Sequence, residues 1–231
     1  MVDTATEENV QSARQAFDLP APVYLCLGNH DMRPPDALRT WLAEAPGFFV
    51  NDRPSFSIAR DDCVLHVMPT QWNATPYFWD KAMDPHFLAE QMETTRAAIE
   101  ERPEAIHILC THSPVMGVPT EQTGFPAAYH DPGEAFRQTV FDLVKSNPRA
   151  LCVLSAHTHI NSHVEENGVH FVTASAFVET PFEFKLIDVT PERMRLSTIS
   201  LAALLDFAPR YDDSRRYVQG REQDRAFEVT L

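Results

Sequence analysis

Three short apolar runs, each ending abruptly in a polar cluster that contains histidine, constrain this sequence more than any other feature. The runs are Pro22–Leu27, Ala105–Cys110 and Leu151–Ser155. Continuous apolar stretches of this length are typical of strands that are buried on both faces of a sheet. Because functional groups gather at the carboxyl ends of such strands, we expect the three clusters to face one point.

The three clusters carry side chains that bind transition metals. They are Gly28-Asn29-His30-Asp31, Thr111-His112-Ser113-Pro114 and Ala156-His157-Thr158-His159. Residues i and i+2 of an extended backbone point the same way, so His157 and His159 are expected to face one metal centre. With the amide oxygen of Asn29 and the imidazole of His112, this mixed donor set suits Mn, Fe, Zn or Co better than Ca or Mg. A single histidine at a strand end is more often a hydrogen-bonded surface residue, but three such clusters in this order favour a metal site.

The rest of the pattern alternates helices and strands and then continues with strands alone. Helices are predicted over 5–17 (capped by Thr4 and Glu7), near 35–45, from Asp84 to about 99, and around 136–144. Hairpins are predicted over 55–68 and around Asn167-Gly168, and two strands near 182–189 and 194–200. The stretch 114–133 is predicted to be a loop. We therefore expect one layered α/β domain over 1–231, with a core over about 1–200 and a loosely packed tail over 201–231.

The composition argues against several classes of function. The chain has 19 basic and 33 acidic residues, a net charge of −14, which repels nucleic-acid backbones and disfavours a nuclease. No apolar run has the length of a membrane span and no leader pattern opens the chain, so a cytoplasmic protein is expected. The four cysteines lie in apolar runs without a C-x-x-C pair, which favours reduced core thiols over a disulfide or metal framework.

The remaining histidines divide into two groups. His66, His107, His163 and His170 lie inside strand patterns and are predicted to be structural. His130 lies in the long loop and is the one candidate for contact with a substrate. The aromatic segment 69–84, which includes Trp72 and Trp79, fits either the core or a stacking surface for a base.

The sequence resembles the calcineurin-like metallophosphoesterases, in the branch that contains cyclic-nucleotide phosphodiesterases. The resemblance rests on the three clusters above, with Ala156 standing where the family usually has glycine. It implies a β-sandwich flanked by helices and two divalent ions (Mn, Fe or Zn) that hold a small phosphoester and activate water. It also implies roles for the matching residues. Asn29, His112 and His157 would bind one metal, His159 would help to bind the second, and His30, oriented by Asp31, would act at the scissile phosphate.

The sequence also departs from that family. The family's Asp-x-His and Gly-Asp motifs do not occur before Gly28, so we expect an N-terminally truncated member that lacks the first strand-helix-strand unit. Such a chain would hold one metal or none, and an exposed sheet edge would favour a homo-oligomer. The alternative function is a catalytically inactive protein that binds one metal, a phosphate compound or a partner.

Overall fold

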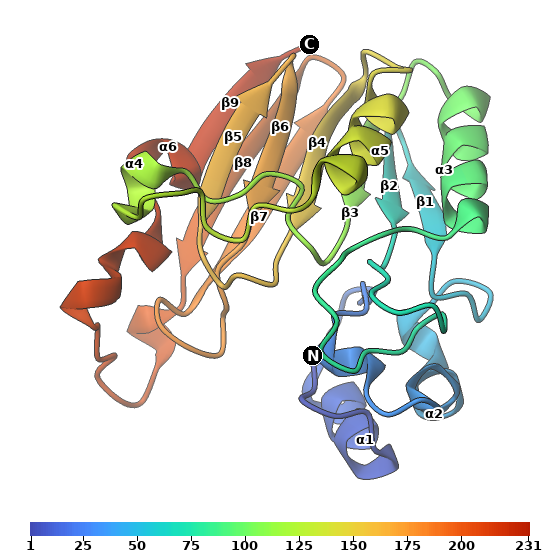
Figure 1. The fold of residues 1–231 in the computed structure, drawn as a ribbon, viewed down its shortest axis with the longest axis horizontal. Coiled ribbons are helices and arrows are strands. Elements are labelled where there is room, and N and C mark those ends of the chain that lie inside the picture. The colour runs from blue at the N-terminus through green and yellow to red at the C-terminus, as the bar shows by residue number, and fades with distance from the viewer.

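A six-stranded mixed sheet forms the centre of the molecule, and the computed structural model describes residues 1–231 (Figure 1). Its strands are β1 (Phe56–Arg60), β2 (Cys63–Val67), β3 (Ile106–Cys110), β4 (Ala150–Ser155), β5 (Ser162–Glu166) and β6 (Val169–Thr173), in the order β1-β2-β3-β4-β6-β5. Neighbouring strands from β2 through β3 and β4 to β6 are parallel, and the two predicted hairpins, β1–β2 and β5–β6, are antiparallel at the edges. This arrangement places the carboxyl ends of β3 and β4 side by side.

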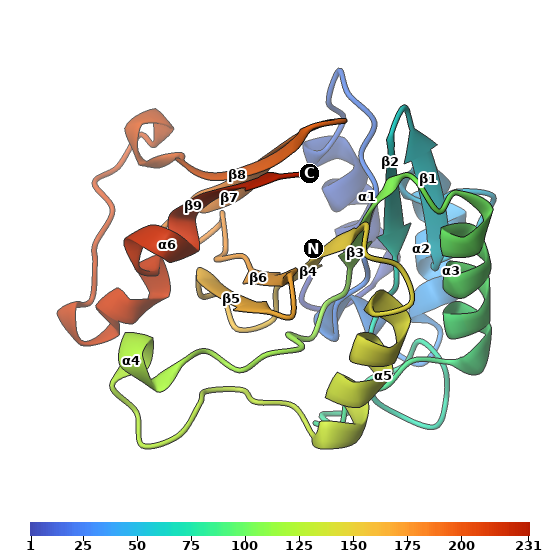
Figure 2. The same cartoon turned by 90° about the horizontal axis from the view of Figure 1, so that it is seen from above.

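A second, three-stranded antiparallel sheet covers one face of the first. It contains β7 (Glu183–Thr190), β8 (Arg193–Ser200) and β9 (Ala226–Thr230) in that order. Buried Ile106, Cys152, Met194 and Leu196 belong to one apolar cluster between the sheets. Helices α3 (Ala89–Glu101) and α5 (Glu134–Val144) lie on the opposite face of the six-stranded sheet (Figure 2). The predicted layered α/β architecture is therefore present, with two packed sheets and helices outside them.

The chain at 201–231 does not form the loose tail that the sequence analysis predicted. It contains the short helices η3 (Ala202–Leu204), η4 (Asp213–Gln219) and α6 (Glu222–Arg225), followed by strand β9. Phe227, Val229 and Leu231 pack against the cluster between the sheets. Their alternation with Glu228 and Thr230 has the period of a strand with one buried face, a signal that the surrounding charges obscured.

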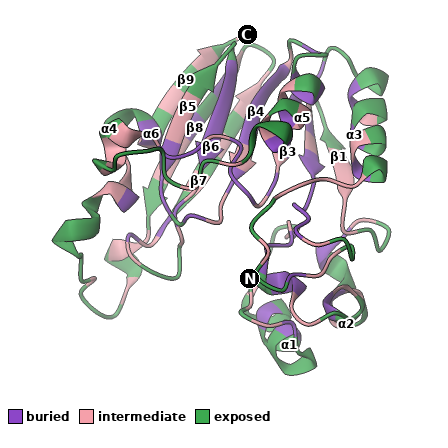
Figure 3. Cartoon of the chain, in the orientation of Figure 1, coloured by how far each residue is buried: buried purple, intermediate pink, exposed green.

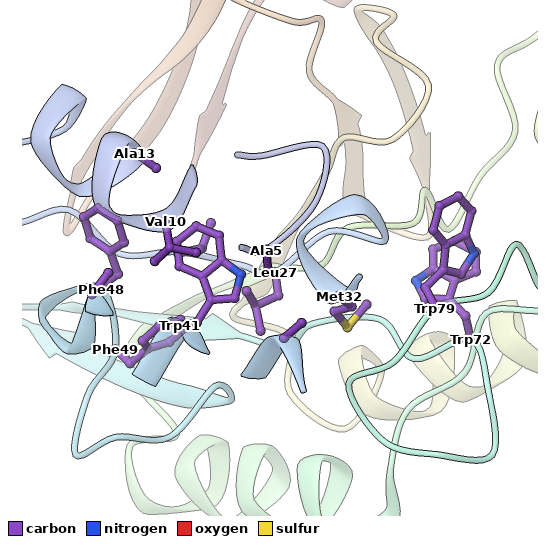
Figure 4. Close-up of a cluster of buried hydrophobic side chains, with 13 residues drawn as sticks. Ala5, Val10, Ala13, Leu27, Met32, Trp41, Phe48, Phe49, Trp72 and Trp79 are labelled. Carbon is purple, nitrogen blue, oxygen red and sulfur yellow. The ribbon is translucent and has the colours of Figure 1, made fainter. Parts of the chain in front are cut away.

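Residues 1–50 form an N-terminal lobe at the carboxyl ends of the central strands. The lobe contains α1 (Glu7–Ala16), η1 (His30–Met32), α2 (Ala37–Glu44) and η2 (Pro46–Phe48). Figure 4 shows its apolar cluster, in which Trp41 and Leu27 are fully buried. Thr6, not the predicted Thr4, caps α1, because its hydroxyl accepts a hydrogen bond from the Asn9 amide at 3.2 Å.

The run Pro22–Leu27 is not a strand, which corrects the prediction. Leu25 and Leu27 are buried, as the apolar sequence indicates, but the run has no β-ladder partner. The amide of Leu25 donates to the Phe48 carbonyl at 3.0 Å instead. Apolarity predicts burial, whereas a strand also needs a neighbouring backbone with which to pair.

The four strand histidines hydrogen-bond in pairs, in agreement with a structural role. His66 Nε2 lies 2.9 Å from His107 Nδ1, and His163 Nε2 lies 2.9 Å from His170 Nδ1. His107 Nε2 donates to the Arg102 carbonyl, so His107 Nδ1 must accept and His66 Nε2 must donate.

All four cysteines are free thiols. Burial is greatest in the central strands and least in the segments around α4 (Thr120–Thr123) and η4 (Figure 3). None of the helices combines the length and apolarity that crossing a lipid bilayer demands.

Candidate metal centre

Three of the predicted ligands, Asn29, His112 and His157, converge at the carboxyl ends of β3 and β4. His112 Nε2 lies 2.8 Å from Asn29 Oδ1 and 3.3 Å from His157 Nδ1. His112 follows β3 by two residues and His157 follows β4 by two, whereas Asn29 precedes η1 in the N-terminal lobe. The expected convergence of the clusters therefore holds for these three side chains.

Gly28 and Thr70 hold His112 in place. A Cβ atom on residue 28 would lie only 2.6 Å from His112 Cε1, so only glycine lets the ring pack against this backbone. The Thr70 hydroxyl accepts hydrogen bonds from the amides of His112 (3.3 Å) and Ser113 (3.0 Å). Thr70 is fully buried and was not singled out from the sequence, because a single threonine between Pro69 and Gln71 carries no pattern.

Both converging imidazoles are neutral at pH 7. Burial, reinforced by the neighbouring His157, holds the pKa of His112 well below its usual value of 6.5. Burial also lowers the pKa of His157 to about 4, with a further contribution from His130. A neutral imidazole keeps the lone pair that a metal ion requires, so the protonation state of both rings suits ligation.

The His157-x-His159 motif is not extended, which corrects the premise on which both rings were expected to face one point. Both residues have left-handed backbones, with φ of 61° for His157 and 58° for His159. His159 Nδ1 lies 2.5 Å from Glu179 Oε1, and both of these side chains are about half exposed. His159 therefore has an acidic partner of its own, which the sequence analysis missed because Glu179 lies 20 residues away in the chain.

His130 and Trp72 complete the surroundings of His157. The ring of His130 lies 5.2 Å from that of His157 in an edge-on arrangement, and Trp72 is also 5.2 Å from His157. The loop over 114–133 brings His130 here. It forms only α4 and an isolated bridge between Val118 and Tyr129. Trp72 is buried within the core cluster of Figure 4, yet its indole N–H has no hydrogen-bond acceptor.

His30 and Asp31 separate in the structure. His30 Nδ1 lies 2.6 Å from Asp3 Oδ1, and its ring packs 5.2 Å from that of Trp79. Asp31 is buried, and its carboxylate accepts hydrogen bonds from the amides of Gly28 (2.9 Å) and Val2 (2.8 Å) and from the terminal amine. Asp3, rather than Asp31, is therefore the carboxylate that contacts His30, and Asp31 fixes the turn that carries Asn29.

Two of the separations among the converging donors are compatible with one divalent ion. Ligand atoms about 2.1 Å from one ion, at angles between octahedral and tetrahedral, lie about 3.0–3.4 Å apart, close to the 2.8 and 3.3 Å observed. No three His, Cys, Asp or Glu side chains come together with the geometry of a metal site. The set consists of two imidazoles and an amide oxygen, so no carboxylate offsets the charge of the ion. The indole N–H of Trp72, whose ring lies beside His157, has no acceptor within the protein.

Comparisons with known proteins place the fold but not the activity. No protein-family model matches the chain, and no curated protein sequence matches it. Among solved structures, a dimetal phosphatase from Danio rerio matches with a TM-score of 0.50 and 12% identity, over 84% of this chain and 85% of that chain. A conserved uncharacterized protein from Streptococcus pneumoniae, described as a predicted phosphoesterase, matches at 8% identity over 99% of this chain and 93% of its own. Its TM-score of 0.39 is too low to assign a fold. The first likeness shows a metallophosphoesterase-like fold.

Proposed function

We propose that this protein is a metal-dependent phosphoester hydrolase whose ion is held by Asn29, His112 and His157. One observation carries the proposal: Asn29 Oδ1 and His157 Nδ1 both approach His112 Nε2, and both imidazoles are neutral. The fold shared with a dimetal phosphatase supports it. A divalent ion at this centre would polarise a phosphoryl oxygen and lower the pKa of a bound water.

The residues around the centre have distinct tasks in this proposal. The carboxylate of Asp3 only accepts hydrogen bonds, so the proton between it and His30 belongs to His30 Nδ1. That arrangement leaves His30 Nε2 available to exchange a proton with a leaving-group oxygen, and half of the ring is exposed to solvent. Asp31 is a positioning residue, because it holds the Gly28 amide and thus the turn from which Asn29 projects.

His159 and His130 lie near the site but are not among the three proposed ligands. His159 with Glu179 offers one imidazole and one carboxylate, which is fewer ligands than a second enclosed ion needs. We therefore propose a centre that binds one ion. His130, edge-on to His157 and half buried, is placed to contact the substrate.

Hydrolysis of bis-p-nitrophenyl phosphate with added Mn²⁺ tests the proposal. We expect turnover by the wild type and a loss of more than about 100-fold in His157→Ala, since removal of a ligand exceeds the 10- to 100-fold effect of losing a ligand's supporting partner. His86→Ala is the matched control, because the His86 side chain makes only a 3.5 Å contact to the Asp84 carbonyl and lies outside the centre. Equal activity in His157→Ala and the wild type would refute the proposed site.

The absence of a carboxylate ligand favours a second candidate function, in which the protein binds one ion and a phosphate compound without turnover. Equilibrium binding of Mn²⁺ separates the two functions. Binding that depends on His157, in a wild type that does not hydrolyse the ester, supports this second function. Turnover that depends on His157 excludes it.

A further inference from the structure

A cavity of about 210 Å³ opens beside the candidate metal centre. It is lined by His159 and Glu179 and by Arg210, Arg215 and Arg216 of the C-terminal segment. The cavity therefore shares His159 with the three-cluster site but extends away from it. Nothing in the proposed hydrolysis uses these arginines.

Two of the arginines have no acidic partner. Arg216 pairs with Asp213 at 2.6 Å, and the neighbouring Arg221 and Arg225 pair with Asp224 and Glu183. Arg210 and Arg215, in contrast, form no ion pair and their guanidinium groups make no hydrogen bond within the protein. The chain has 33 acidic and 19 basic residues, and both of these unpaired guanidinium groups lie at one cavity. Each offers five donors in a planar fork that matches a phosphate or a carboxylate.

The acidic side chains at the same cavity are already engaged. The Asp212 carboxylate accepts hydrogen bonds from the amide (2.9 Å) and the hydroxyl (2.6 Å) of Ser214, where it caps η4. Glu179 lies 2.5 Å from His159 Nδ1. Neither carboxylate forms an ion pair with Arg210 or Arg215, so both guanidinium groups remain available to an anion.

The wall that carries these arginines is fixed to the core next to the histidine motif. The Asn161 amide donates to the Val218 carbonyl at 3.0 Å, and its side chain donates to the Gln219 carbonyl at 3.2 Å. Further along, Arg225 makes a two-pronged ion pair with buried Glu183, at 2.7 and 2.9 Å. Because Asn161 follows His159 by two residues, the cavity and the candidate centre are built on the same loop.

The volume of the cavity limits the size of the ligand. Sites for drug-sized molecules are about 300–1,000 Å³, so 210 Å³ accommodates one small group rather than a nucleoside. From this geometry we infer that the cavity binds a second anionic group, a phosphate or a carboxylate, on the substrate. The assignment of this group to a substrate rests on the proposed function. The substrate class is then a small phosphoester whose leaving group carries a further negative charge.

Binding of inorganic phosphate to the metal-free protein, measured by calorimetry, tests the cavity without any catalysis. We expect the double variant Arg210→Ala/Arg215→Ala to bind phosphate at least about tenfold more weakly than the wild type, because charge-assisted hydrogen bonds are lost. The control is Arg39→Ala/Arg60→Ala, which removes the same charge from two exposed arginines in other parts of the molecule. Equal affinities in all three proteins, or no phosphate binding by the wild type, would overturn the inference.

Hydrolysis of phenyl phosphate and of 3-carboxyphenyl phosphate with Mn²⁺ then tests the link to the substrate. The wild type should show the lower KM for the carboxylated ester, and the double variant should lose that preference while its kcat stays unchanged, since the interaction is equal in ground and transition states. A preference that survives in the double variant would overturn the inference. Absence of all turnover, with phosphate binding that still depends on the arginines, would refute the proposed function and leave the anion site standing.

Discussion

Replacing Gly28 by alanine should displace the His112 ring and weaken metal binding while the protein stays folded. The new Cβ atom would lie 2.6 Å from His112 Cε1 and 2.8 Å from His112 Nδ1. Carbon atoms in favourable contact are about 3.5–4.0 Å apart, so the ring must retreat by about 1 Å. A shift of that size carries His112 Nε2 away from its present 2.8 Å approach to Asn29 Oδ1.

The energetic cost follows from the same contact. Overpacking of a well-filled site costs about 1–3 kcal/mol, which we expect as the loss in free energy of unfolding. Misplacing one of the three proposed ligands should weaken Mn²⁺ binding by at least about tenfold, the lower end of what loss of a ligand's supporting partner causes. The two effects have one origin, so they should appear together.

Urea unfolding and calorimetric titration with Mn²⁺ measure both effects. Gly47→Ala is the matched control, because a Cβ atom there meets nothing within 4 Å. We expect the control to change stability by less than about 1 kcal/mol and to bind Mn²⁺ as the wild type does. If Gly28→Ala bound Mn²⁺ with wild-type affinity, the contact between Gly28 and His112 would not govern the site and the reasoning would fail.

Three further predictions concern other parts of the molecule. Arg225→Ala removes the two-pronged partner of the buried Glu183 and should lower the free energy of unfolding by about 2–3 kcal/mol. The loss should be smaller when Glu183→Gln is added. Unchanged stability of Arg225→Ala would contradict this prediction. Burial, and to a smaller extent the neighbouring His107, lowers the pKa of His66 to about 3. Below about pH 6.5, His66 therefore binds a proton in the unfolded chain but not in the folded chain. Stability should therefore fall as pH drops from about 6.5 towards 3, and in His66→Gln the slope should be smaller by about 1.4 kcal/mol per pH unit; an unchanged slope would contradict this. Mn²⁺ at about 100 times its Kd should raise the Tm by about 5–11 °C in the wild type; an equal rise in His157→Ala would place the ion elsewhere.

The central strands and the convergence of the clusters were predictable because both follow from local patterns. Ala105–Cys110 and Leu151–Ser155 read as buried strands, and β3 and β4 occupy those positions. Parallel neighbours end at the same edge of a sheet, which is why His112 and His157 meet. The run Pro22–Leu27 has the same composition, but pairing depends on a partner strand that the run's own residues do not encode.

The details of the site depend on contacts that are distant in the chain. The partnership of His30 with Asp3 joins residues 27 positions apart, and that of His159 with Glu179 joins residues 20 apart. Left-handed backbone at two histidines is rare enough that no propensity argument predicts it. The sequence analysis missed the arginine-lined cavity because it predicted a loose tail over 201–231. The alternation of Phe227 and Val229, which anchors that segment, stands among charged residues.

Diffraction from crystals grown with Mn²⁺, with anomalous differences measured at the manganese edge, tests the central claim most directly. We predict one strong peak about 2.0–2.3 Å from Asn29 Oδ1, His112 Nε2 and His157 Nδ1, because Asn29 Oδ1 and His157 Nδ1 both lie close to His112 Nε2. A peak at any other group of side chains, or no peak at millimolar Mn²⁺, would contradict the claim that these three residues form a metal centre.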